Sequence, residues 1–170
     1  MIETERLILR PHILNDFDEL LAVSNDAEVM QFITHGAHAT RQDVWNKLLR
    51  NIGHWTALGH GVFAVVDRQT GRYVGDTGLA DFHRDLGDDF DPFPEAAWVF
   101  AGHGQGKGYA TEAAHAAHRW FDAERGARRT VCIIDPDNAA SIGVARKLGY
   151  GHYGEIEYKG DHVLKFERLP

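Results

Sequence analysis

The 170-residue sequence has very little cysteine and no long apolar run. Its single cysteine, Cys132, excludes an internal disulfide and a paired-cysteine metal site. The cysteine lies in the apolar segment RTVCIID, where we interpret it as a buried strand thiol rather than a nucleophile. No apolar run approaches the ~20 residues that a membrane-spanning helix needs, and the first residues lack the pattern of a signal peptide. We therefore expect a cytoplasmic protein with no membrane partner.

The sequence also lacks an excess of positive charge. Its 18 Lys and Arg residues are outnumbered by 25 Asp and Glu residues, which gives a formal net charge of −7. That sign argues against a nucleic-acid partner and against an anionic membrane surface. Any anion that this protein binds must be held by local donors, because the overall electrostatic field opposes its approach.

Apolar periodicity and turn residues predict one mixed α/β domain over residues 1–170. The expected order of elements is β-α-α-β-β-β-α-β-α-β-β, and no repeat, linker or low-complexity tract divides it. The predicted strands are 6–11, 61–67, 72–82, 95–101, 128–135, 151–158 and 161–168. The predicted helices are 15–33 (one helix or two), 42–58, 107–125 and 136–149.

The most distinctive segment is GHGQGKGYATEA, in which glycine occupies every second position from Gly102 to Gly108. A P-loop would need Ser or Thr where Gly108 stands, and a dinucleotide-binding fingerprint fails in every register. The segment lies at a predicted strand-to-helix junction, where free N–H groups and the helix dipole favour an anion. It is either a backbone grip for a pyrophosphate or a flexible connection.

The pattern Gln105-x-x-Gly108-x-Ala110 resembles the acetyl-CoA-binding signature of the GNAT superfamily of N-acetyltransferases. The surrounding QGKGYATEA is similar to the RimJ/RimL-like branch, which acetylates ribosomal-protein N-termini. The segments TERLILRP, TGRYVGDTGL, EAAWVF and NAASIGVARKLGY resemble other parts of that branch in the expected order, so the resemblance covers nearly the whole chain. It implies a central mixed, mostly antiparallel sheet with splayed central strands, flanked by helices.

By this resemblance the chain uses acetyl-CoA as co-substrate and needs no metal. The pyrophosphate would meet backbone N–H groups of the glycine segment, and the pantetheine arm would lie between the splayed strands. The residues implied in acetyl-CoA binding are Val99, Ala101, Gln105, Gly106, Lys107, Gly108, Tyr109, Ala110, Asn138 and Ser141. Asn138 also has a purely structural interpretation, as the N-cap of the late helix.

The implied reaction transfers an acetyl group to a primary amine by direct attack in a ternary complex. A backbone N–H near Val99 would stabilise the thioester oxygen. Glu95 is the first candidate for the base that deprotonates the amine, and His83 is the second. Many family members carry a tyrosine that protonates the leaving thiolate. Ala145 stands at that position here, which leaves the Ser141 hydroxyl, although Glu95 and Ser141 also fit structural roles at a strand end and on a helix face.

The residues say less about the acceptor. The loop HRDLGDDFDPFPE combines acidic and aromatic residues, which favours a cationic amine unless the loop is simply solvated. His35, His83 and Glu95 are the candidate substrate contacts, and the acceptor is a peptide N-terminus or a small amine. His115 and His118 lack the spacing of a helical zinc motif, so we interpret them as a solvated helix face.

Two other interpretations stay open. The chain could be a catalytically silent acyl-CoA sensor, for which Ala145 leaves room, although Glu95 and Ser141 argue against it. It could also be a structural protein with an incidental glycine turn, which would bind no CoA. Homodimers are common in the family, but the sequence defines no interface for one.

Overall fold

The computed structural model describes all 170 residues, and its strands form one eight-stranded sheet. The strands are β1 (Ile2–Glu3), β2 (Leu7–Pro11), β3 (Val62–Asp67), β4 (Tyr73–Ala80), β5 (Glu95–Phe100), β6 (Thr130–Ile134), β7 (Gly151–Tyr158) and β8 (Asp161–Arg168). Their order across the sheet is β1-β2-β3-β4-β5-β6-β8-β7. Every neighbouring pair is antiparallel except β5 and β6, which run parallel. The sheet is therefore mixed and mostly antiparallel, as the resemblance implied.

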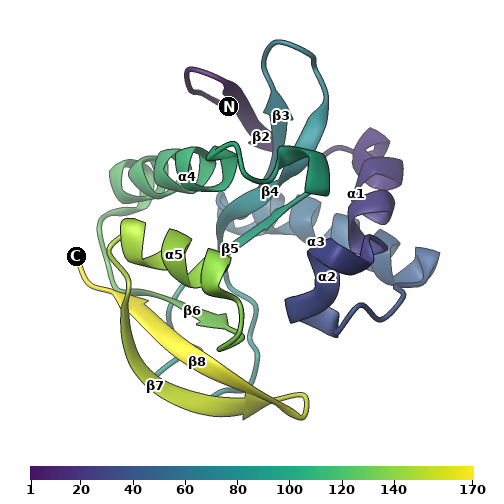
Figure 1. Cartoon of the computed structure of the whole chain (residues 1–170). Coiled ribbons are helices and arrows are strands. Elements are labelled where there is room, and N and C mark those ends of the chain that lie inside the picture. Colours follow the sequence, from purple (N-terminus) through teal and green to yellow (C-terminus); the bar gives the residue numbers. More distant parts are fainter.

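Helices cover both faces of this sheet (Figure 1). They are α1 (Phe17–Ser24), α2 (Ala27–Thr34), α3 (Arg41–Leu58), α4 (Tyr109–Arg125) and α5 (Ala139–Lys147), with short 3-10 turns at Leu14–Asp16 and Gly102–Gly104. The apolar faces of α4 and α5 pack on one side, and those of α1 and α2 pack on the other. No helix combines the length and the apolar character that crossing a bilayer would require.

The observed elements follow the predicted ones with two informative differences. The sequence pattern does not predict β1, because two residues are too few to show a period, although they pair with β2. The helix expected from residue 107 begins at Tyr109 instead. Gly108 precedes it with φ of 79°, a left-handed conformation that cannot belong to a right-handed helix.

The central strands β5 and β6 separate soon after they meet. Glu95 and Val131 form their only paired position, whereas β5 pairs with β4 along the whole length of β5. The expected splay is therefore confirmed, and it opens a gap beside β5 in the middle of the sheet.

Small residues on α4 fix the position of this gap relative to the glycine segment. Ala113, Ala116 and Ala117 are almost fully buried, so α4 approaches the sheet closely, against Phe63 and Phe100. Because β5 ends at Phe100 and α4 begins a few residues later, the N-terminus of the helix is held next to the open end of the gap. The sheet and α4 together position the candidate site.

Candidate active site

The segment between β5 and α4 presents a row of free backbone donors. Gly106 and Gly108 have φ of 71° and 79°, a left-handed conformation that costs other residues about 1–2 kcal/mol. A Cβ at Gly106 would meet no atom within 4 Å, so the backbone is open to a ligand there. No backbone carbonyl accepts a hydrogen bond from the N–H groups of residues 106–110. These donors and the helix dipole form an anion-binding site.

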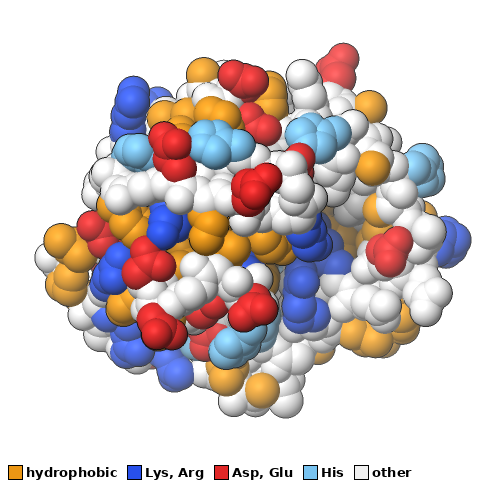
Figure 2. All heavy atoms as spheres, turned by 90° about the horizontal axis from the view of Figure 1, so that it is seen from below, with side chains coloured by type: hydrophobic (Ala, Val, Ile, Leu, Met, Phe, Trp, Pro, Cys, Tyr) orange, Lys and Arg blue, Asp and Glu red, His pale blue; other side chains and the backbone are white.

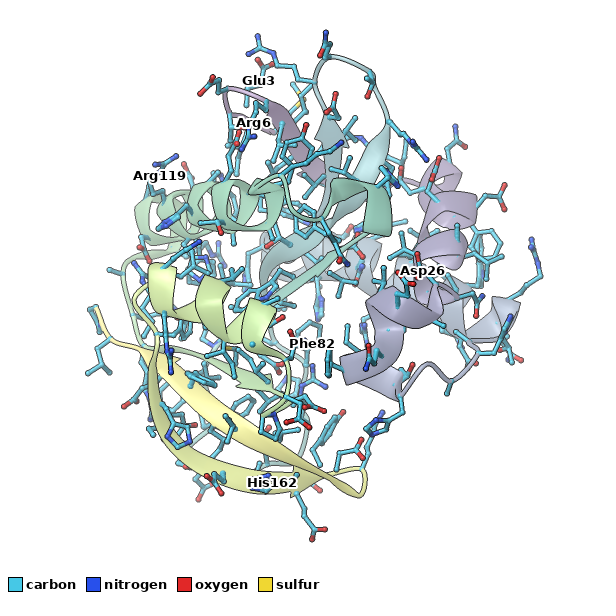
Figure 3. All side chains as sticks on the ribbon, in the orientation of Figure 1. Glu3, Arg6, Asp26, Phe82, Arg119 and His162 are labelled. Carbon is cyan, nitrogen blue, oxygen red and sulfur yellow. The ribbon has the colours of Figure 1, made fainter.

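Side chains from two directions hold this segment in place. Arg6 lies beside α4 (Figure 3), and its Nη1 donates a hydrogen bond to the carbonyl of Lys107 at 2.9 Å. The same guanidinium pairs with the Glu112 carboxylate, with an Nη2–Oε2 distance of 2.6 Å. From the other side, Gln105 Nε2 donates to the carbonyl oxygen of Phe100 at 3.1 Å. Sequence reasoning missed Arg6, because it read the first strand only as part of the fold.

The register between β4 and β5 decides which backbone groups face the gap. Ala101 N–H donates to Val74 O at 3.0 Å, and these two residues lie opposite each other in the ladder. Hydrogen-bonded and non-hydrogen-bonded pairs alternate in an antiparallel ladder, so Asp76 and Val99, two positions along, also exchange both bonds. The N–H groups of Val99 and Ala101 are therefore directed towards β4.

The residues between them point the other way. The backbone groups of Trp98 and Phe100 face the gap, and the Phe100 carbonyl there accepts the bond from Gln105. The expectation that Val99 and Ala101 offer their N–H groups to a ligand in the gap is therefore wrong by one residue. The free donor at the centre of the gap is Trp98 N–H.

Two cavities meet at β5. The smaller, of about 470 Å³, occupies the gap between β5 and β6 and is lined by Ile134, Asn138 and Ser141 among others. The larger, of about 830 Å³, lies on the side of the sheet covered by α2 and α3. Trp98 and Val99 line both cavities, so molecules bound in the two would meet at the middle of β5.

The start of α5 forms the far wall of the smaller cavity. Ser141 N–H donates to Asn138 Oδ1 at 3.0 Å, so Asn138 is the helix N-cap, and both residues also line the cavity. Ala145 is fully buried in the core and lines neither cavity. Tyr150 is buried, and its hydroxyl lies 2.8 Å from His118 Nε2. His118 is thus a core residue, and the interpretation of a solvated histidine face is wrong for it.

Glu95 lies at the start of β5 as a buried carboxylate in an ion pair. It is 4% exposed and lines the smaller cavity, where Arg84 Nε donates to its Oε2 at 2.6 Å. Arg84 Nη1 in turn donates to the Tyr158 hydroxyl at 2.9 Å. Burial raises the pKa of Glu95 and outweighs the opposing effect of Arg84. The residue is held in one orientation and has a higher proton affinity than an exposed glutamate.

A second buried carboxylate, Asp76, was not found from the sequence. It lines the larger cavity from β4, directly opposite Val99, and lies 3.1 Å from His12 Nε2 and 3.4 Å from Lys47 Nζ. The Tyr73 hydroxyl donates to it. Burial alone would raise the pKa of Asp76, but Lys47, His12 and Tyr73 outweigh it and lower the pKa. The sequence contains a sign of this site, because an aspartate inside an otherwise apolar strand is rarely buried unless other side chains pair with it.

The two candidate histidines lie at the cavities but are exposed. His35, at the end of α2, lines the smaller cavity, and its Nε2 lies 2.7 Å from Asp161 Oδ1 at the start of β8. His83, in the loop after β4, lines the larger cavity. The structure therefore brings both next to the site, one at each cavity.

The acidic loop after β4 contributes less to the site than its composition suggests. Only Asp85 and Glu95 line a cavity. Asp89 pairs with Lys165 at 2.6 Å, and Asp91 accepts two backbone N–H groups of its own loop at 3.1 and 3.0 Å. Asp89 and Asp91 therefore stabilise the loop, and only part of its acidic character remains as an argument for a cationic acceptor.

Comparison with known proteins assigns this geometry to a family. The family model described as acetyltransferase (GNAT) domain matches residues 6–151. The chain therefore belongs to the GNAT acetyltransferase family and is an N-acetyltransferase.

Individual relatives agree along the whole chain. The uncharacterized protein YkkB of Bacillus subtilis is 32% identical over 97% of this chain and 93% of its own length. A solved structure described as a GnaT-family acetyltransferase from Bordetella pertussis is 30% identical, with a TM-score of 0.87 over 99% of this chain and 98% of that chain. RimL, a ribosomal L7/L12 α-N-protein acetyltransferase solved with coenzyme A, has a TM-score of 0.77 at 18% identity, over 98% of this chain and 95% of that chain. At this identity the likeness to RimL shows that the two chains share a fold.

Proposed function

We propose that this enzyme takes its acetyl group from acetyl-CoA and transfers it directly to a primary amine while both are bound. The observation that carries the proposal is that two cavities share Trp98 and Val99 as a common wall. One cavity is a slot between splayed strands, and the other is a wider cleft on the side of the sheet that α2 and α3 cover. An amine in the cleft can reach a thioester in the slot without a covalent enzyme intermediate.

The residues present fit a coenzyme A molecule. The free N–H groups of residues 106–110 suit a pyrophosphate, and the gap beside β5 suits an extended pantetheine arm. Asn138 and Ser141 line that gap near its end. Acetyl-CoA, when bound, supplies the activated thioester. RimL, which shares this fold, was solved in complex with coenzyme A, and this supports coenzyme A as the ligand.

The thioester oxygen needs a donor where negative charge develops during attack. Trp98 N–H faces the gap and is the donor we propose, in place of Val99. Such a fixed backbone donor stabilises the oxyanion without reorganisation and typically contributes about 100- to 1000-fold in rate.

Two buried carboxylates compete for the role of general base, and their pKa shifts favour Glu95. Asp76 is nearer to Val99, but Lys47, His12 and Tyr73 stabilise its charged form and lower its pKa. Burial raises the pKa of Glu95, which makes it the stronger proton acceptor. Glu95 is three residues from Trp98, roughly 10 Å along a strand, so the proton passes through water. The protonated amine gives this proton to Glu95 and attacks the acyl carbon; the C–S bond then breaks, and the second proton of the nitrogen passes to the departing thiolate.

Ser141 is the hydroxyl that we propose near the leaving sulfur. It lines the smaller cavity, whereas Ala145 is buried in the core and Tyr150 is held by His118. A serine hydroxyl is a weak acid, but it can donate a hydrogen bond to the departing thiolate.

The direct test is release of free CoA from acetyl-CoA against a panel of amines. The panel holds peptides with different N-termini, polyamines, aminoglycosides, amino acids and phosphorylated amines, and calorimetry measures acetyl-CoA binding in parallel. Turnover that depends on an added amine supports the proposal. Tight acetyl-CoA binding with no turnover across the panel would contradict it and favour the silent sensor.

A further inference from the structure

The larger cavity contains a cluster of cations that the catalytic proposal does not use. Phe82 lies near the middle of the molecule, between α5 and α2 (Figure 3). The Cζ atoms of Arg50 and Arg84 lie 5.2 and 5.0 Å from the centre of its ring. Arg84 Cζ and Lys159 Nζ also lie 5.0 and 5.4 Å from the centre of the Tyr158 ring. All five side chains line the larger cavity.

The charges in this cluster do not balance. Glu95 neutralises Arg84, but no carboxylate oxygen lies within 4 Å of Arg50 or Lys159. Arg50 keeps contact with solvent, and partial loss of solvent and then the neighbouring Arg84 charge lower its pKa, against the opposing effects of Tyr158 and Glu95. Two cations of the cleft are therefore without a partner, in a protein whose net charge is −7.

Acidic side chains line the same cavity but do not neutralise this pair. Asp76 is engaged by Lys47, and Asp43 accepts hydrogen bonds from Thr40 at the start of α3. Asp85 and Glu157 are exposed, as are Arg50 and Lys159, and neither acid lies within 4 Å of either cation. In Figure 2, Lys and Arg side chains accordingly lie in a hollow near the centre, beside hydrophobic ones.

We propose that the acceptor is a small amine that carries an anionic group, a carboxylate or a phosphate, bound by Arg50 and Lys159. The inference rests on the proposed function and names the substrate class of its acceptor cleft. A guanidinium stacked on an aromatic ring keeps its edge free for bidentate bonds to such an anion. A cavity of about 830 Å³ is the size of a small-molecule site.

The test compares matched acceptors that differ only in the anion. Leucine is paired with leucinamide and with 3-methylbutylamine, and phosphoethanolamine is paired with ethanolamine. We expect kcat/KM to be at least about tenfold higher for the anionic member of one pair, as one charge-assisted contact predicts. The pair that responds tells a carboxylate from a phosphate. Turnover of polyamines, peptides or other amines without an anionic group, with no preference for a carboxylate or a phosphate, would overturn this inference. The acetyltransferase proposal would still stand.

Variants then test which residue holds the anion. Arg50→Gln should abolish the preference and leave the KM for acetyl-CoA unchanged, and Arg50→Lys should keep part of it. The control is Arg41→Gln, because Arg41 lies on the same helix but stacks on Phe17, outside both cavities. A preference that survives Arg50→Gln and Lys159→Gln together would refute the assignment. Absence of turnover with every acceptor would instead overturn the proposed function and this inference with it.

Discussion

The substitution Glu95→Gln tests the chemistry most directly, because it removes the charge and keeps the shape. The amide oxygen can still accept the hydrogen bond that Arg84 Nε now donates at 2.6 Å. What the variant loses is a carboxylate whose pKa burial has raised. If Glu95 accepts the proton of the amine, kcat should fall by about 100- to 10,000-fold, which is about 3–5 kcal/mol of transition-state stabilisation.

The same substitution also affects stability, and the two effects can be separated. Glu95 is 4% exposed and Arg84 is partly buried, so breaking their pair leaves a cation without its partner. Loss of one member of a buried pair costs about 3–5 kcal/mol. The cost should be lower here, because the Tyr158 hydroxyl still binds Arg84. A folded variant with normal acetyl-CoA affinity and a large loss of kcat shows a chemical role.

The assay that decides is the pH profile of kcat/KM for the acceptor. For the native enzyme, activity should fall as the pH drops through the raised pKa of Glu95, and Glu95→Gln should lack this acid limb. Arg84→Gln removes the cation that opposes the shift, so it should move the limb to higher pH. A Glu95→Gln enzyme with native kcat and the native acid limb would refute the assignment of the base.

Three further substitutions test the pyrophosphate segment and the core. Gly108→Val should abolish acetyl-CoA binding by calorimetry, whereas Gly71→Val, with a similar φ of 69° but in the distant turn between β3 and β4, should not. Arg6→Gln should raise the KM for acetyl-CoA about two- to fivefold at constant kcat, because a half-exposed ion pair contributes up to about 1 kcal/mol. Burial lowers the pKa of His118 to about 4, so the unfolded chain alone takes up this proton between about pH 6.5 and 4. The free energy of unfolding should therefore decrease across this interval by up to roughly 3 kcal/mol, and His118→Gln should remove that part of the slope in urea titrations.

Much of the fold could be predicted from sequence because its signals are local. The alternating or continuous apolar strands, the capped helices and Gly108 before α4 all act over a few residues. The pyrophosphate segment was found for the same reason, since its glycines lie close together in the chain. The acceptor cleft could not be found in this way. Arg50, Phe82 and Tyr158 come from a helix, a loop and a late strand, and only the folded sheet brings them together.

The error at Val99 shows where sequence reasoning reaches its limit. The side chains of Glu95 and Val99 share a face with Asp76, and that alternation could be predicted from the strand pattern. The direction of each backbone N–H depends on which strand is the neighbour and on the register of the pair, and one residue of register reverses it. The bond from Ala101 to Val74 fixes that register. The donor for the thioester oxygen thus belongs to Trp98, a residue whose side chain gave no reason to select it.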